Sequence, residues 1–192
     1  MIPHKVVALL VGWVLAISAG GYAMLRYELT GRQPAARSGH WPYSTKLTRE
    51  QQRATLVMFL HPQCPCSRAS VAELTTLLTH CRDQVDVTVV FVRPEVFPPG
   101  WEVASLWRAV EALPVAMVVD PGGREAREFG AHTSGEVFLY DAQGALVFQG
   151  GITAGRGHQG DNPGRWAITA FLQHGTTNCP QTTVYGCPLF NS

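Results

Sequence analysis

The sequence has almost no net charge and no block of basic residues. Its 192 residues contain 15 Lys plus Arg and 14 Asp plus Glu, a balance of +1 with histidine neutral. Nucleic-acid-binding proteins gather lysine and arginine on one face or along one segment, whereas the arginines here are scattered. We therefore expect no nucleic-acid partner. No internal repeat is visible, and the length that remains after the apolar N-terminus suits one ordinary domain.

Charge is missing altogether from residues 6–25 (VVALLVGWVLAISAGGYAML). About 20 apolar residues in a helix cross a bilayer core of roughly 30 Å, so this stretch predicts a single-pass membrane anchor. A cleaved signal peptide is the alternative, because small residues precede Gly20, but the apolar core of a signal peptide is typically shorter, about 7 to 15 residues. Lys5 and Arg26 flank the stretch, so charge determines its orientation only weakly.

Four parts follow along the chain. Residues 1–28 form the anchor or signal peptide, and residues 29–46 form a flexible linker rich in Gly, Pro, Ser and Arg. Residues 47–175 form the folded domain, and residues 176–192 form a tail with two cysteines. We place the domain on the extracytoplasmic, periplasmic side of the cell membrane, because export suits the thiol chemistry described next.

The stretch HPQCPCSRAS, residues 61–70, carries the chemistry. An apolar strand is predicted before it at 55–60, and a helix with one apolar face is predicted after it at about 67–81, with Ser70 and Glu73 at capping-box spacing. Cys64 and Cys66 therefore lie at the start of a helix. Free amide groups and the positive end of the helix dipole favour a thiolate there, which can be a nucleophile or a metal ligand.

The rest of the domain alternates strands and helices and ends in a hairpin and a helix. Such alternation predicts an α/β fold with a central mixed sheet and helices on both faces. The breaker FPPG, residues 97–100, precedes the helix at 103–113, and the final helix is capped by Asp161 or Asn162 and carries Trp166 on its apolar face. The predicted elements are a strand at 85–92, a helix at 103–113 stopped by Pro114, a strand at 115–119, a helix at 124–129, a hairpin of 135–140 with 145–149, and a helix from 163 to about 172.

With these residues in view, the region from Thr55 to Leu172 resembles the thioredoxin superfamily, in particular the membrane-anchored TlpA, ResA and redoxin type of bacterial thiol:disulfide protein. The segment FLHPQCPCSRASVAEL resembles the family's W-C-x-x-C-R-x-E-x-P-x-L, which places Cys64 on the nucleophilic cysteine. A second match is the segment FGAHTSGEVFLYDAQGALVFQGG, which looks like the family's Y-G-V-x-x-T-P-x-x-F-L-I-D-x-x-G-x-x-x-x-x-x-G. CPCSRAS and GGIT also look like a small bacterial group called RedB.

Two departures from the family pattern stand at the site. The second cysteine of the family falls on Ser67, so the second thiol has moved to Cys66, and Gly135 occupies the place of a cis-proline that usually faces the active cysteine. A C-x-C disulfide closes a very small ring, and strain makes a disulfide easier to reduce. The resemblance implies a loop beside Cys64 that contacts substrate, and together with His61 this gives the predicted contact residues His61, His132, Thr133, Ser134 and Gly135.

Several residues keep two interpretations. His132 could tune the thiolate, relay a proton or bind a metal, or be a solvated loop residue, and the same holds for His61. Cys81 is expected in the core. Cys179 and Cys187 could form a local disulfide, or the tail could return Cys187 to resolve Cys64 or complete a metal site. The Gly-rich loop GRGHQGDNPG, residues 155–164, contains Arg156, His158, Asp161 and Asn162, and it could line a cleft or serve only to cap the next helix.

Two functions from different classes follow. The first is a membrane-tethered thiol:disulfide oxidoreductase, in which the Cys64 thiolate attacks a disulfide and Cys66 or Cys187 resolves the mixed disulfide, with protein thiols as partners and no cofactor. The second is a copper(I) carrier, because soft thiolates select copper(I), with Cys64, Cys66 and His132 as ligands. Sco proteins, which share the family's fold, use two cysteines and a distant histidine, but their cysteines are spaced C-x-x-x-C.

Overall fold

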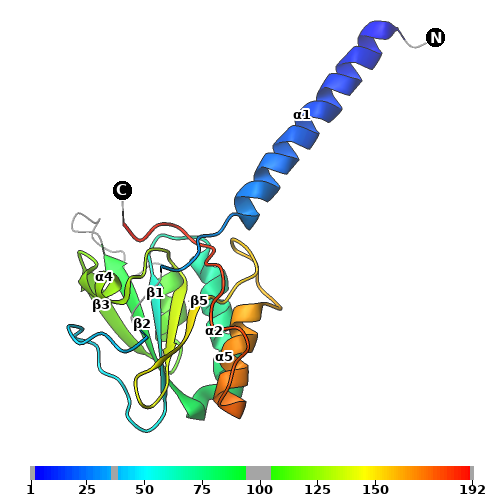
Figure 1. Ribbon diagram of the computed structural model, residues 1–192. Coiled ribbons are helices and arrows are strands. Elements are labelled where there is room, and N and C mark those ends of the chain that lie inside the picture. The colour runs from blue at the N-terminus through cyan, green and yellow to red at the C-terminus, as the bar shows by residue number, and fades with distance from the viewer. Residues whose placement is uncertain (1–2, 36–38, 94–104, 191–192) are drawn as a thin grey trace. The chain divides into compact units, whose positions relative to one another are not determined.

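The computed structural model describes residues 3–35, 39–93 and 105–190 of the chain (Figure 1). It divides into two units, Met1–Thr30 and Gly31–Ser192. The first unit contains the helix α1, His4–Leu29, in which no residue is buried. Its most apolar window has a mean hydropathy of 2.0, so α1 is long and apolar enough to cross a membrane.

The second unit is built on a five-stranded mixed sheet with the strand order β3-β2-β1-β4-β5. Its strands are β1 Ala54–Leu60, β2 Val85–Arg93, β3 Ala116–Pro121, β4 Glu136–Tyr140 and β5 Leu146–Gly151. The first three strands are parallel, and β4 pairs antiparallel with both β1 and β5. The prediction of a mixed sheet with a terminal hairpin is confirmed.

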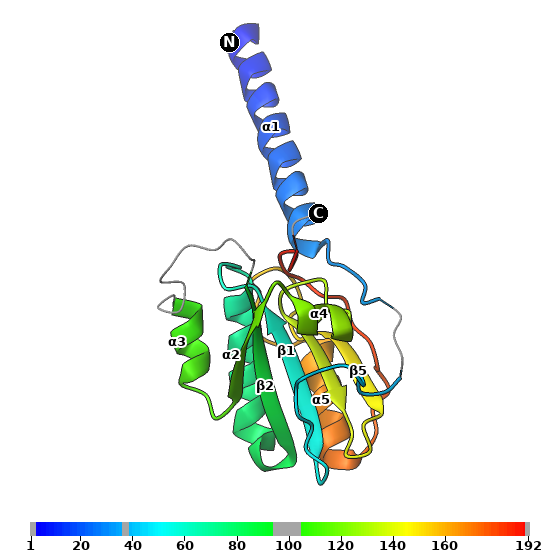
Figure 2. The same ribbon diagram turned by 90° about the vertical axis from the view of Figure 1, so that its left-hand side faces the viewer.

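Three helices cover one face of this sheet (Figure 2): α2 Ser67–Cys81, α3 Ser105–Glu111 and α5 Pro163–His174. Side chains of β1 alternate between the faces, so Leu56, Met58 and Leu60 point to these helices. They pack with Leu74 of α2 and with the other members of one buried cluster, which includes Cys81 as expected. Burial of this apolar surface is what fixes α2, and with it the cysteines at its N-terminus.

Among the described residues, one short helix lies on the opposite face, α4 Arg124–Phe129 (Figure 2). Val57 and Phe59 of β1 point to this side and pack against Phe129. The remaining cover comes from segments without regular structure, because Trp41 packs edge-on against Phe129 with ring centroids 5.1 Å apart, and Leu189 of the tail is buried in the same cluster. Helices therefore lie on both faces, but the core on the α4 side is completed by residues from the N-terminal and C-terminal segments of the domain.

The segment predicted as a flexible linker, 29–46, is largely attached to the domain. Arg32 forms a bridge with Val184, the Trp41 amide donates a hydrogen bond to the Gly144 carbonyl at 2.9 Å, and Thr45 donates to the Glu125 carboxylate. Its polar composition suggested a solvated tether, but several of its backbone groups are hydrogen-bonded to the domain instead. Residues 36–38 of this segment lie outside the described residues.

The tail is also part of the fold. Gln181 pairs with Gln149 of β5, and Pro188 pairs with Thr133 in the loop before β4. Figure 1 shows the tail running along the β5 side of the sheet and ending near the same end of the sheet as the start of α2. The tail therefore connects the edge of the sheet with the predicted site.

Two local predictions were wrong, and a third is confirmed with different bounds. Ser70 and Glu73 lie inside α2, which begins at Ser67, and they form no capping box. The helix predicted at 103–113 is confirmed as α3, Ser105–Glu111, and FPPG and Val103 lie outside the described residues. Trp166 was expected in the core but is 60% exposed. The helix cap before α5 is confirmed as Asn162, whose side chain accepts a hydrogen bond from the Arg165 amide.

Candidate thiol site

β1 ends at Leu60, and a tight turn carries the chain from there into α2. The Cys64 amide donates to the His61 carbonyl at 3.0 Å, and the Ser67 amide donates to the Cys64 carbonyl at 3.2 Å. Cys66 occupies the N-cap position, and its carbonyl accepts from the Ala69 amide at 3.1 Å. A strand thus delivers both cysteines to the start of a helix, as the sequence predicts.

Three sulfur atoms converge at this point. Those of Cys64, Cys66 and Cys187 all lie within 4.8 Å of one another. Cys64 is 3% exposed, while Cys66 and Cys187 are half-buried. All five cysteines are free thiols, so Cys179 and Cys187 form no disulfide in this structure, and the tail instead brings Cys187 to Cys64.

The three thiols differ in pKa. Burial raises the pKa of Cys64, but hydrogen bonds from Cys187 and Ser67 outweigh it and hold that pKa below the ordinary value of 9.0. Burial and the charge of Cys64 raise the pKa of Cys66, against the opposing effect of Arg156. Burial and the neighbouring Cys64 raise the pKa of Cys187 to about 12. The site therefore favours a single thiolate, on Cys64.

The loop before β4 closes the site from the sheet side. The Ser134 hydroxyl accepts a hydrogen bond from the His61 amide at 2.6 Å and lies 2.7 Å from the Ser67 hydroxyl. Gly135 has φ +89°, and a Cβ on it would lie 2.6 Å from the Ser70 hydroxyl. This position, where the resemblance to the thioredoxin superfamily predicts a proline, therefore requires a glycine, because the loop approaches α2 too closely for a side chain.

A buried carboxylate holds the preceding residues of this loop. Glu136 accepts hydrogen bonds from the amides of His132 and Thr133 at 3.0 and 3.4 Å and from the Gln149 side chain at 3.2 Å. Burial raises the pKa of Glu136, with these hydrogen bonds opposing the rise. Glu136 thus fixes the loop backbone, a role that sequence reasoning missed because only the fold brings Gln149 beside it.

The two histidines take different positions. His61 is half-buried, and burial lowers its pKa, which favours the neutral ring. The His132 side chain is exposed, with its ring centroid 6.5 Å from that of Phe190, and it is not a member of the sulfur cluster. Cys187 therefore occupies the third place that the copper(I) interpretation assigned to His132.

The glycine-rich loop after β5 supplies a cation to the site. Arg156 donates to the Gly186 carbonyl and interacts electrostatically with Cys66 and Cys187. The loop is anchored by Glu73 of α2, which accepts from the Gly160 amide at 2.6 Å and forms an ion pair with Arg165 at 2.7 Å. The loop therefore both lines the site and caps α5.

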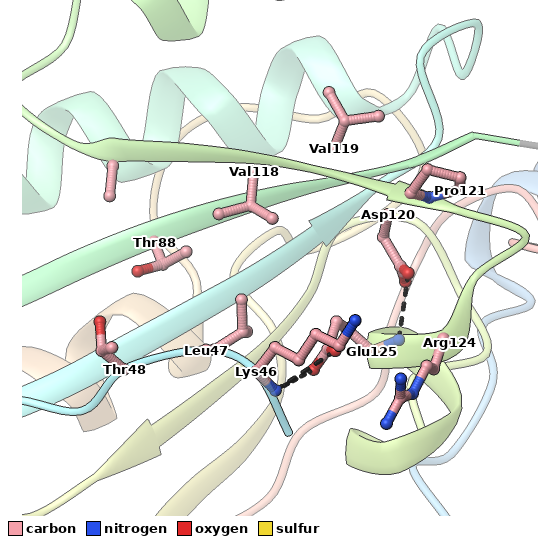
Figure 3. A pocket seen from close by; sticks show the side chains of 11 residues that line it. Lys46, Leu47, Thr48, Thr88, Val118, Val119, Asp120, Pro121, Arg124 and Glu125 are labelled. Carbon is pink, nitrogen blue, oxygen red and sulfur yellow. Dashed lines mark hydrogen bonds between the residues drawn. The ribbon is translucent and has the colours of Figure 1, made fainter. Parts of the chain in front are cut away.

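A pocket of about 400 Å³ lies elsewhere in the domain, over β3 and α4 (Figure 3). Its acidic groups are already used within the protein: Asp120 accepts from the amide of Glu125, and Glu125 accepts from the amide of Lys46. No cysteine lines this pocket. The sulfur cluster, rather than this pocket, is the candidate functional site.

Comparisons with known proteins place the chain by its fold. No family model matches, and no curated protein matches by sequence. A hypothetical protein of Sinorhizobium meliloti aligns with a TM-score of 0.63 and 17% identity, over 83% of this chain and 97% of that one. An uncharacterised conserved protein of Geobacillus kaustophilus aligns with a TM-score of 0.60 and 18% identity, over 84% and 92%.

A secreted disulfide oxidoreductase of Mycobacterium tuberculosis aligns less completely, with a TM-score of 0.42 and 17% identity over 50% of this chain and 67% of that one. Likeness at these identities concerns the fold. The three parallel strands with crossover helices, the terminal hairpin with its helix, and the cysteines at the start of α2 give this chain a thioredoxin-like fold.

Proposed function

We propose that the protein is a membrane-tethered, extracytoplasmic thiol:disulfide oxidoreductase whose nucleophile is Cys64. One observation carries the proposal: a cysteine at a helix start has its pKa held below 9.0 by hydrogen bonds while two further thiols lie beside it. A thiolate with an adjacent thiol is what disulfide exchange requires, because the first attacks and the second resolves.

The reaction needs no cofactor. The Cys64 thiolate attacks one sulfur of a substrate disulfide, forms a mixed disulfide and releases the other sulfur as a thiolate. A second thiol of the protein, Cys66 of the CPC motif or Cys187, then displaces the remaining substrate sulfur. The substrate gains two electrons and the protein becomes a disulfide, and the reverse sequence oxidises a dithiol. The partners are therefore protein thiols or disulfides, and His61 with residues 132–135 contacts them.

The proposed location joins two features. α1 is long and apolar enough to anchor the chain, and disulfides persist in oxidising compartments outside the cytoplasm. Protease treatment of intact cells with a permeabilised outer envelope tests the sidedness. A domain degraded without lysis of the inner membrane supports the location, and a domain degraded only after lysis contradicts it.

The activity is tested on the full chain in detergent by reduction of insulin with a small dithiol as electron source. Cys64→Ser should reduce the rate to the uncatalysed level, and Cys179→Ser should leave it unchanged because Cys179 lies outside the sulfur cluster. A Cys64→Ser variant as active as the natural chain would refute the proposal.

A second candidate function is a copper(I) carrier, and the convergence of three sulfurs favours it. Three thiolates suit copper(I) because it is a soft ion. Anaerobic titration with copper(I) distinguishes the ligand sets. Loss of tight binding in Cys187→Ala but not in His132→Ala would support the sulfur cluster as ligands, and the opposite pattern would favour His132. Failure of the natural chain to bind copper(I) would dismiss this function.

A further inference from the structure

The tail pairs with the loop before β4 through an isolated antiparallel bridge. The Ser134 amide donates to the Cys187 carbonyl at 2.8 Å, and the Leu189 amide donates to the His132 carbonyl at 2.9 Å. Thr133 and Pro188 are the paired residues of this antiparallel bridge. Main-chain pairing of this kind is how an exposed edge binds an extended peptide, with alternate side chains directed into the protein.

In the tail, the side chain that points into the protein is that of Cys187, and it lies beside the nucleophile Cys64. The Cys187 amide donates a hydrogen bond to the Cys64 sulfur at 3.4 Å, and the two sulfurs lie within 4.8 Å of each other. A cysteine presented in this way stands where a cysteine of a substrate peptide must stand to exchange with Cys64. The tail therefore fills the peptide position with its own thiol.

Specific contacts hold the tail on both sides of this cysteine. Gly186 is buried so closely that a Cβ on it would lie 1.9 Å from the Ser134 carbonyl oxygen. Leu189 is 2% exposed and belongs to the core on the α4 side of the sheet. The Arg127 guanidinium lies 4.4 Å from the centre of the Phe190 ring. The placement of Cys187 is thus built into the packing.

Cys66 is less suited to bond with Cys64. It has helical backbone angles, φ −67° and ψ −26°, and its carbonyl is already bonded to the first turn of α2. Pro65 fixes φ between the two cysteines, and disulfide geometry tolerates little deviation in the separation and direction of the two side chains. A bond between Cys64 and Cys66 would therefore disturb the start of α2, whereas Cys187 approaches Cys64 from a separate segment, the tail.

We propose that the tail is an internal substrate peptide of Cys64, and that Cys187 rather than Cys66 is the resolving thiol. The inference rests on the proposed function and deepens it. The tail opens to admit a substrate disulfide, and Cys64 attacks it and releases one substrate thiolate. When the tail closes, the Cys187 thiol gives its proton to solvent and its sulfur attacks the Cys64 sulfur. The second substrate thiolate leaves, and a Cys64–Cys187 disulfide forms with two electrons transferred to the substrate.

The test uses the full chain in detergent with less than one equivalent of the aromatic disulfide dithiobis-nitrobenzoate. Attack by Cys64 releases one coloured thiolate per reagent molecule, and resolution releases the second. Cys66→Ser should still release both and yield a Cys64–Cys187 disulfide in peptide mapping. Cys187→Ser should release the second at least tenfold more slowly, and the matched control Cys179→Ser should match the natural chain.

Different failures point to different parts of the scheme. If Cys64→Ser still consumes the reagent at the natural rate, the proposed function fails. If Cys64→Ser is inert but Cys187→Ser releases the second thiolate normally and peptide mapping finds a Cys64–Cys66 disulfide, the proposed function stands and the internal-substrate inference is overturned.

Discussion

Substitution of Gly186 by alanine should open the tail without removing any thiol. The new Cβ would lie 1.9 Å from the Ser134 carbonyl oxygen, and contacts of a Cβ below 3.0 Å essentially never occur, so the two backbones must separate by about 1 Å. The hydrogen bond from the Ser134 amide to the Cys187 carbonyl is 2.8 Å long. Such a displacement breaks it and also the longer contact from the Cys187 amide to the Cys64 sulfur.

The size of the effect follows from these two hydrogen bonds. Each contributes about 1 kcal/mol net, so their loss favours the open tail by about 2 kcal/mol, or about 30-fold in population. Cys64 is 3% exposed when the tail is docked, and its alkylation must wait for opening. The alkylation rate of Cys64 in Gly186→Ala should therefore rise by about 30-fold when opening is a rapid pre-equilibrium.

The measurement is mass-spectrometric quantification of iodoacetamide labelling at Cys64 over a range of pH. Plateau rates at high pH must be compared, because the lost hydrogen bonds from Cys187 also raise the pKa of Cys64 and reduce its thiolate fraction at lower pH. Gly39→Ala is the matched control, since a Cβ there meets nothing within 4 Å. A plateau rate in Gly186→Ala within about threefold of the control, less than 1 kcal/mol, would refute the reasoning.

Three further predictions concern the groups that support the site. Glu73→Ala leaves the guanidinium of Arg165 without its buried partner and should lower the free energy of unfolding by about 3 to 5 kcal/mol, measured by urea denaturation against the exposed control Glu111→Ala. Burial raises the pKa of Glu136, so its contribution to stability is present below pH 4.5 and falls as pH rises through its folded pKa. The free energy of unfolding of Glu136→Gln, relative to that of the natural chain, should therefore increase from pH 4 to 7. A difference between the two proteins that does not change with pH would contradict this. The rate of alkylation of Cys64 as a function of pH should have its midpoint below pH 9.0 in the natural chain. In Cys187→Gly the midpoint should lie at a higher pH, because the side-chain hydrogen bond from Cys187 that lowers the pKa of Cys64 is lost.

Much of the fold could be predicted from the sequence because local pattern determines it. The apolar run of β1, the periodic apolar face of α2 and the Asn162-Pro163 cap of α5 each carry their own signal. The pairing of β4 with β5 followed from the turn at 141–144. Alternation of these elements was enough to give the mixed sheet and the placement of Cys64 at a helix start.

What the sequence did not reveal depends on contacts between distant segments. Glu73 had the spacing of a capping residue, but its carboxylate binds Arg165, 92 residues away. Residues 41–47 and 186–190 have the composition of loops, yet Trp41 and Leu189 complete the core on the α4 side. Isolated apolar residues such as Trp41 and Leu189 give no periodic signal, so their burial could not be predicted. For the same reason the sequence could not distinguish the return of Cys187 to Cys64 from a local disulfide with Cys179.

The uneven pKa values of the three thiols suit an ordered sequence of steps. While Cys64 carries the charge, burial and this neighbouring charge keep Cys187 protonated, with a pKa of about 12. After Cys64 has entered a mixed disulfide, its charge is gone, and the part of that rise caused by Cys64 disappears while Arg156 remains beside Cys187. Cys187 thus becomes easier to ionise only once there is a mixed disulfide to resolve. A tail anchored by Leu189 in the core makes this thiol available at every closure, so resolution would not depend on a second protein.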